Sequence, residues 1–159
     1  MPLPRPPLPT LALCALAVAI AGLRYGGFLL AFIVPCVGLG ALIGIGRLIG
    51  APGQRPLYVA KLLAWVCAVG LIACAHGGYA WRARLAADAL RAQVEAYRAA
   101  HGAWPNDDAL PPRTEAMQYW GAHYSLTTEK PRLCYLATSQ PLSTWCYDFD
   151  AARWQFTAN

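Results

Sequence analysis

The sequence predicts an α-helical membrane anchor of two or three transmembrane helices followed by a small α+β domain. In that domain a long helix packs on an antiparallel sheet of three or four strands. Three observations lead to this prediction. Residues 1–80 are mostly apolar and hold no acid, residues 83–101 have the apolar period of an amphipathic helix, and the remaining residues alternate in short strand-like runs. We therefore expect a transmembrane region over 1–80 and a folded domain over 81–159.

The first apolar segment, residues 8–23, is short for a transmembrane helix. At about 1.5 Å per residue it reaches roughly 24 Å, whereas the bilayer core is about 30 Å thick. Its small residues Ala19 and Ala21 also resemble the end of a cleaved signal peptide. Because Arg5 alone supplies positive charge ahead of it, we favour an uncleaved first span over a signal peptide.

The second apolar segment, residues 26–46, is long enough to span a bilayer and contains Gly40 and Gly44. Glycines four residues apart let helix backbones approach closely. We favour internal helix packing at these glycines. The alternative is a homo-oligomer that forms through the same pair.

The third apolar segment, residues 57–80, reaches roughly 36 Å as a helix and should span the membrane, in contact with membrane lipids. The basic residues that fall on one side of the predicted spans are Arg5, Arg47, Arg55 and Lys61. Arg24 falls on the other side. Because cytoplasmic loops carry the excess of Lys and Arg, we expect a bacterial inner-membrane protein whose C-terminal domain is periplasmic.

The amphipathic stretch should form a helix that continues directly from the third span. Its apolar face is made of Ala83, Ala87, Leu90, Val94 and Tyr97. A charged stripe beside this face keeps the same spacing with alternating sign, and we expect it to face water. Gly102 suits a helix C-terminus and Pro105 prevents the helix from resuming, so the helix should end near His101.

The net charge of +5 belongs to the apolar part of the chain. Residues 1–81 carry five basic residues and no acid, which leaves eight basic and eight acidic residues in 82–159. A nucleic-acid-binding domain needs clustered Lys and Arg on a folded face. We therefore expect no nucleic-acid partner.

Strand-like runs lie near residues 119–128, 132–138, 143–149 and 153–157. If Cys134 and Cys146 face each other across an antiparallel pair, Leu136 opposes Thr144, Tyr135 opposes Trp145, and the turn centres on Gln140. We favour a disulfide between these cysteines over two free thiols, since such a pair in a small domain is typical of an oxidising compartment.

A second hairpin should turn at Ala151 and Ala152, with Phe149 opposite Trp154 and Tyr147 opposite Phe156. Alternation then places the aromatic residues on one face of the sheet, covered by the apolar face of the helix. The predicted domain core comprises Leu90, Val94, Tyr97, Tyr135, Trp145, Tyr147, Phe149, Trp154 and Phe156.

The segment from Val94 to Leu110 reads VEAYRAAHGAWPNDDAL. It resembles the helix end and following loop of type IV pilins and type II secretion pseudopilins, which place a Tyr and a His-Gly-aromatic-Pro motif between a long helix and a small antiparallel sheet. For residues 80–159 the resemblance implies a pilin-like fold and work in a secretion or pilus assembly. Gly77 to Ala80 do not match the cleavage site of that family, so the resemblance does not extend to a processed filament subunit.

The residue pattern gives less support to a redox or metal site and to enzymatic catalysis. Cys67, Cys74 and His76 lie close in sequence and raise the alternative of a redox or metal protein, but no Cys-x-x-Cys motif accompanies them. No Gly-x-Ser-x-Gly motif and no phosphate-binding glycine loop occurs. We therefore expect no enzyme activity, no catalytic residues, no cofactor and no metal.

These observations lead to one functional expectation and one alternative. We expect a non-enzymatic inner-membrane protein that presents a periplasmic pilin-like domain to a protein partner in the periplasm or inner membrane, within an envelope assembly of secretion or pilus type. The alternative is a membrane-anchored immunity protein that binds a periplasmic toxin.

Overall fold

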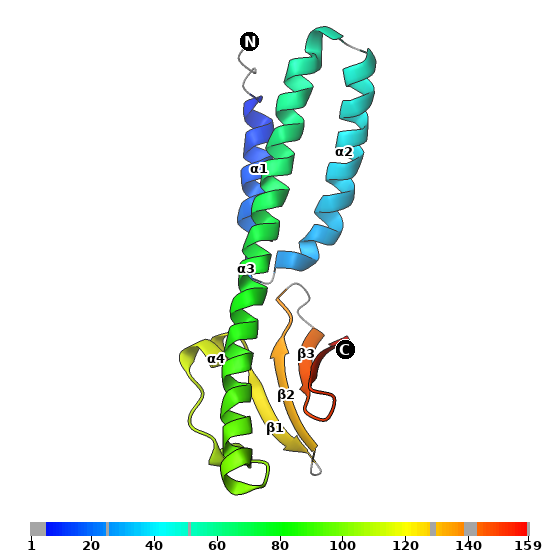
Figure 1. Cartoon of the computed structure of the whole chain (residues 1–159). Coiled ribbons are helices and arrows are strands. Elements are labelled where there is room, and N and C mark those ends of the chain that lie inside the picture. The colour runs from blue at the N-terminus through cyan, green and yellow to red at the C-terminus, as the bar shows by residue number, and fades with distance from the viewer. Residues whose placement is uncertain (1–5, 25, 51, 128–129, 139–142, 159) are drawn as a thin grey trace. The chain divides into compact units, whose positions relative to one another are not determined.

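The computed structural model describes residues 6–24, 26–50, 52–127, 130–138 and 143–158, and it divides into two compact units. Unit 1 covers Met1–Gly77 and unit 2 covers Gly78–Asn159. Unit 1 contains α1 (Leu8–Ala21), η1 (Gly26–Leu29), α2 (Leu30–Gly50) and η2 (Pro52–Gln54). The helix α3 (Arg55–His101) passes without interruption from unit 1 into unit 2 (Figure 1).

The 47-residue helix α3 begins in the third apolar segment and ends in the amphipathic stretch. Among the described residues it is the one helix long and apolar enough to cross a membrane, while Leu8–Ala21 and Phe32–Arg47 are shorter apolar helices. Its end agrees with the prediction, because His101 is the last helical residue and Gly102 has a φ of +73°. The N–H of Gly102 donates to the carbonyl oxygen of Arg98 over 2.8 Å, as is common where a helix ends at glycine.

Side chains of α3 contact both other helices of unit 1. The Nε2 atom of His76, which is buried, lies 2.7 Å from the carbonyl oxygen of Ala21 at the end of α1. A Cβ placed on Gly44 of α2 would lie 3.8 Å from the side chain of Leu62. Gly44 therefore faces α3, which is the internal packing that its small size favours.

Unit 2 is a small α+β fold in which α3 packs on a four-stranded antiparallel sheet, as the sequence predicts (Figure 1). The strands are β1 (His123–Thr127), β2 (Lys130–Leu136), β3 (Ser143–Asp148) and β4 (Arg153–Ala158). Their spatial order is β1-β2-β3-β4, so each strand pairs with its neighbour in sequence. The turn expected around Gln140 lies outside the described residues.

The connection from α3 to the sheet contains η3 (Asp107–Ala109) and α4 (Glu115–Tyr119). The run predicted as a strand over 119–128 is thus partly wrong, because Tyr119 ends α4. The hydroxyl of Thr114 accepts a hydrogen bond from the N–H of Met117 over 3.3 Å and caps this helix. The cap explains why the chain turns helical before it enters β1.

Candidate functional site

The disulfide between Cys134 and Cys146 joins β2 to β3, as the sequence predicts. The two cysteines are directly opposite in the register, with Cα atoms 4.1 Å apart. The pairs Tyr135–Trp145 and Leu136–Thr144 also match the predicted register. Because side chains alternate along a strand, the bridge lies on the sheet face opposite the one that Leu133 and Tyr135 present to α3.

The face of the sheet toward α3 carries the core of unit 2. Of the residues predicted for this core, four are buried in it, namely Leu90, Val94, Tyr135 and Tyr147. Trp145, Phe149 and Trp154 are partly buried and pack against the cluster. Burial raises the pKa of the Tyr135 phenol, and the neighbouring Arg84 opposes that shift.

Two residues predicted for the core lie outside it. Phe156 is 45% exposed, because β4 is an edge strand and most of its side chains face solvent. It still contacts Trp145, at a centroid distance of 5.2 Å. Tyr97 is half-buried, and its ring stacks on that of His101 with centroids 4.1 Å apart, since the two residues are four apart at the end of α3.

The predicted register of the β3–β4 hairpin is wrong by two residues. Tyr147 pairs with Trp154 rather than Phe156, and Asp148 pairs with Arg153. The cause is a wider turn, in which Asp148 Oδ1 accepts from the N–H groups of Asp150 and Ala151, each over 3.0 Å. A shift of two keeps every side chain on its predicted face, so the aromatic face forms in spite of the error.

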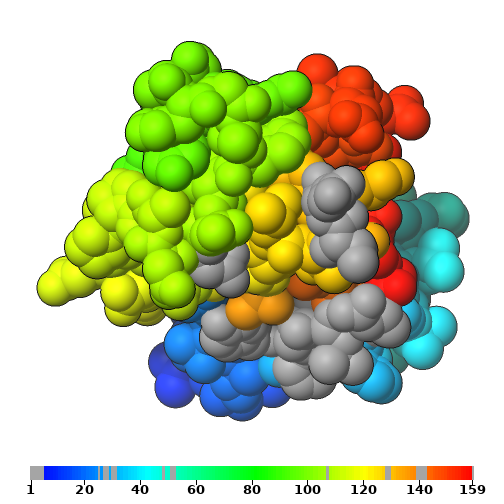
Figure 2. Space-filling view, turned by 90° about the horizontal axis from the view of Figure 1, so that it is seen from below, coloured from blue at the N-terminus to red at the C-terminus, as the bar shows by residue number. Residues whose placement is uncertain are grey.

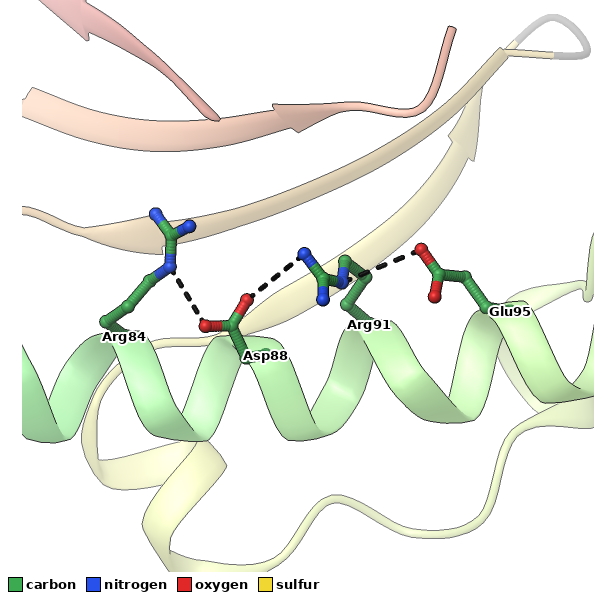
Figure 3. A network of polar contacts seen from close by, with 4 residues as sticks. All are labelled: Arg84, Asp88, Arg91 and Glu95. Atoms are coloured by element: carbon green, nitrogen blue, oxygen red, sulfur yellow. Dashed lines mark hydrogen bonds and ion pairs between the residues drawn. The ribbon is translucent and has the colours of Figure 1, made fainter. Parts of the chain in front are cut away.

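The charged stripe of α3 faces water only in part: Arg84, Asp88 and Arg91 lie beside the sheet and are half-buried, whereas Glu95 is exposed. Asp88 forms ion pairs with Arg84 at 3.0 Å and Arg91 at 3.5 Å, and Arg91 lies 3.6 Å from Glu95 (Figure 3). The guanidinium of Arg84 lies 4.3 Å from the ring centroid of Trp154, and that of Arg91 lies 5.0 Å from the ring of Tyr147. These contacts are cation–π interactions.

Sequence reasoning missed these cation–π contacts, although a signal was present. Arg84, Arg91 and Arg98 are spaced seven apart, so they lie along one line of the helix, above a sheet rich in aromatic residues. Arg98 completes the row, with its guanidinium 4.0 Å from the ring of Trp104. The stripe therefore helps to attach α3 to the sheet.

The segment that resembles pilins forms the end of α3 and the first part of the connection to the sheet. Trp104 packs edge-on against Phe149 with ring centroids 4.8 Å apart, and the buried Pro105 accepts a hydrogen bond from the hydroxyl of Tyr124 over 3.1 Å. In the view from below, the end of α3 (green) and the β3–β4 turn (red) lie side by side, as the Trp104–Phe149 contact requires (Figure 2). The segment thus has a structural role in unit 2.

The outer face of the sheet, which carries the disulfide, has a hollow of about 460 Å³. Lys130 and Arg132 of β2 are exposed at this hollow, together with His123 of β1. Asp148 also borders it, but its carboxylate accepts from the β3–β4 turn and from Gln155. The outer face is therefore polar with exposed basic groups, and it is the candidate interaction surface of unit 2.

The residues considered for a redox or metal site do not gather. Cys67 and Cys74 are exposed on α3, whereas His76 is buried beside Ala21. Within the described ranges, no three His, Cys, Asp or Glu residues are close enough together to hold a metal ion.

A scan against protein-family models and searches of curated proteins and of solved structures give no match to this chain. The resemblance of residues 94–110 to pilins and pseudopilins therefore stays a prediction.

Proposed function

We propose that the chain is a non-enzymatic membrane protein that presents unit 2 outside the cytoplasm for binding to a protein of an envelope assembly. In this proposal α3 crosses a bacterial inner membrane, α1 and α2 lie in the membrane beside it, and unit 2 is periplasmic. The activity is binding, and the outer face of the sheet makes the contact.

The Cys134–Cys146 bridge carries this proposal. Disulfides persist in oxidising compartments such as the periplasm and are rare in the cytoplasm. The bridge lies in the unit that continues directly from the apolar half of α3. Arg47 near the end of α2, with Arg55 and Lys61 at the start of α3, favours the same orientation, since this end of unit 1 would then be cytoplasmic.

The surface of unit 1 favours a membrane environment for all three helices. Large apolar side chains are exposed on each of them, among them Leu16 of α1, Leu42 of α2 and Leu71 of α3. An exposed apolar surface of this kind is costly in water and suits a lipid environment. We propose that α1 and α2 accompany α3 in the membrane and shield part of its surface.

The order of elements in unit 2 favours a pilin-like role without filament assembly. A helix that is apolar in its first half packs its second half on an antiparallel sheet, which is the arrangement that the pilin resemblance implies. The pKa of Tyr135 and that of Asp148 depart from their ordinary values. Tyr135 belongs to the core and Asp148 to a turn, so both have structural roles.

Photo-crosslinking in native membranes tests this function. A photoreactive residue at position 132 on the outer sheet face should yield a discrete adduct with a component of a secretion or pilus-type assembly. The matched control is position 99, which is exposed on α3, and it should not yield that adduct. Adducts only with the chain itself, or the same products from both positions, would contradict the proposed function.

A further inference from the structure

Unit 1 encloses a groove of about 890 Å³ that the proposed anchoring role does not use. Its walls come from α1, α2 and α3 and are almost entirely apolar, with Leu16, Phe32 and Val69 among the lining residues. A volume of several hundred Å³ is typical of sites for small organic ligands. The groove is therefore large enough to hold part of a lipid chain.

One end of the groove is basic. Arg47 of α2 donates from Nη1 to the hydroxyl of Tyr58 over 3.0 Å, and its guanidinium carbon lies 5.9 Å from the centroid of the Tyr58 ring. Lys61, one turn further along α3, places its ammonium 5.3 Å from the same ring. All three residues line the groove. Two cations thus converge on one aromatic ring where the walls change from apolar to polar.

The sequence offers no nearby acid to neutralise this cationic end. Residues 1–81 contain no Asp and no Glu. Two like charges near one ring repel each other, and an anion between them lowers that repulsion. An anion at this end of the groove would come from outside residues 1–81.

From this arrangement we infer that the groove binds an anionic phospholipid, with the acyl chain between the helices and the phosphate at Arg47, Lys61 and the Tyr58 hydroxyl. The basic end adjoins the connection between α2 and α3, which the proposed orientation places on the cytoplasmic side. The cytoplasmic leaflet carries the anionic lipids, so ligand and site meet in the same layer.

The headgroup of the lipid, and not its acyl chain, should determine which lipid binds. An acyl chain that moves from the bilayer into an apolar groove exchanges one apolar environment for another, so the transfer contributes little binding free energy. A basic side chain near an anionic headgroup contributes about 1 kcal/mol, which is about fivefold in affinity for each charge. We therefore expect a preference of at least tenfold for anionic over zwitterionic lipid.

Native mass spectrometry of the full chain in nanodiscs of equal phosphatidylglycerol and phosphatidylcholine content tests this inference. The wild-type chain should retain phosphatidylglycerol at least tenfold over phosphatidylcholine. The double variant Arg47→Gln, Lys61→Gln should bring the ratio close to one. Arg55→Gln removes a charge at the start of α3 that does not line the groove, and it should leave the ratio unchanged.

A second pair of variants blocks the groove without altering its charge. A Cβ at either Gly40 or Gly38 would meet no heavy atom within 4 Å, so both positions tolerate a larger side chain, but only Gly40 lines the groove. Gly40→Leu should lower the amount of retained lipid severalfold, and Gly38→Leu should not. An intact Cys134–Cys146 bridge and an unchanged circular dichroism spectrum would verify that each variant is folded.

Several results would overturn the inference. These are equal retention of both lipids by the wild type, the same loss in Arg55→Gln as in the double variant, and a lipid-free dimer with the groove filled by a second copy. Displacement of the lipid by soluble glycerol phosphate would also overturn it, because a free phosphate would then suffice.

The inference rests on a membrane location of unit 1. A chain that fails to enter nanodiscs contradicts the proposed function, whereas a chain that enters without lipid preference contradicts only this site.

Discussion

At the residue scale, Asp148 determines how the last hairpin of unit 2 pairs. Its carboxylate accepts from two backbone N–H groups of the turn and from Gln155 Nε2, each over 3.0 Å. The N–H of Ala151 and then that of Asp150 hold its pKa below the ordinary value of an aspartate, and Arg153 adds to this effect. One side chain thus sets the register that places Trp154 opposite Tyr147.

We predict that Asp148→Asn lowers the urea midpoint of the full chain in detergent, because the turn loses a charged acceptor. The pKa of the carboxyl in the folded chain lies below its ordinary value of about 3.9. The charge therefore stabilises the fold above about pH 4, and this contribution is lost as the pH falls through the lowered pKa. The difference between wild type and variant should be present at pH 7 and should shrink below about pH 4.

The control for this variant is Asp150→Asn, since the side chain of Asp150 is exposed. Asp150→Asn should unfold at the wild-type urea midpoint at pH 7 and also below about pH 4. A pH-independent difference for Asp148→Asn would mean that the carboxylate charge is not what stabilises the turn.

At the element scale, α3 combines two environments in one helix. Its first half is apolar, whereas its second half attaches to the sheet through buried small and aliphatic residues and through a row of arginines over aromatic rings. The ion pairs are half-exposed, and such pairs contribute no more than about 1 kcal/mol each. Most of the attachment should therefore come from the apolar contacts.

Leu90 provides a test of that attachment, because it is 1% exposed at the centre of the core. Leu90→Ala should destabilise unit 2 by about 2–5 kcal/mol through lost burial and a residual cavity. Leu85, on the same helix, is 50% exposed, and Leu85→Ala should change the unfolding free energy by no more than about 0.5 kcal/mol. Equal effects of the two variants in urea unfolding would show that the second half of α3 is not attached as described.

At the scale of the whole molecule, local patterns predicted much of the fold of unit 2. The spacing of Cys134 and Cys146 predicted the β2–β3 register, and Gly102 with Pro105 predicted the end of α3. The contacts of the charged stripe with the sheet were not predicted. The spacing of Arg84, Arg91 and Arg98 places them on one line of the helix, but it does not tell whether that line is solvated or lies over aromatic rings, since the difference depends on which sheet face meets the helix.

The groove in unit 1 also depends on contacts that local sequence patterns do not give. Arg47 and Lys61 were interpreted only as topology signals, because the positive-inside rule counts charges and does not place them in space. Their convergence on Tyr58 depends on how α2 packs beside α3. The hollow on the outer face of the sheet was not predicted either, because its lining comes from all four strands together.

In the proposed topology, unit 2 and the loop between α2 and α3 lie on opposite sides of a membrane, and cysteine labelling in spheroplasts tests this arrangement. Single cysteines would be placed at Ala99 of α3 and at Gly53 of the loop, both exposed, in a chain whose four free cysteines are replaced by alanine. A membrane-impermeant maleimide should label position 99 in intact spheroplasts and position 53 only after lysis. Labelling of position 53 before lysis, or of position 99 only after it, would contradict the account.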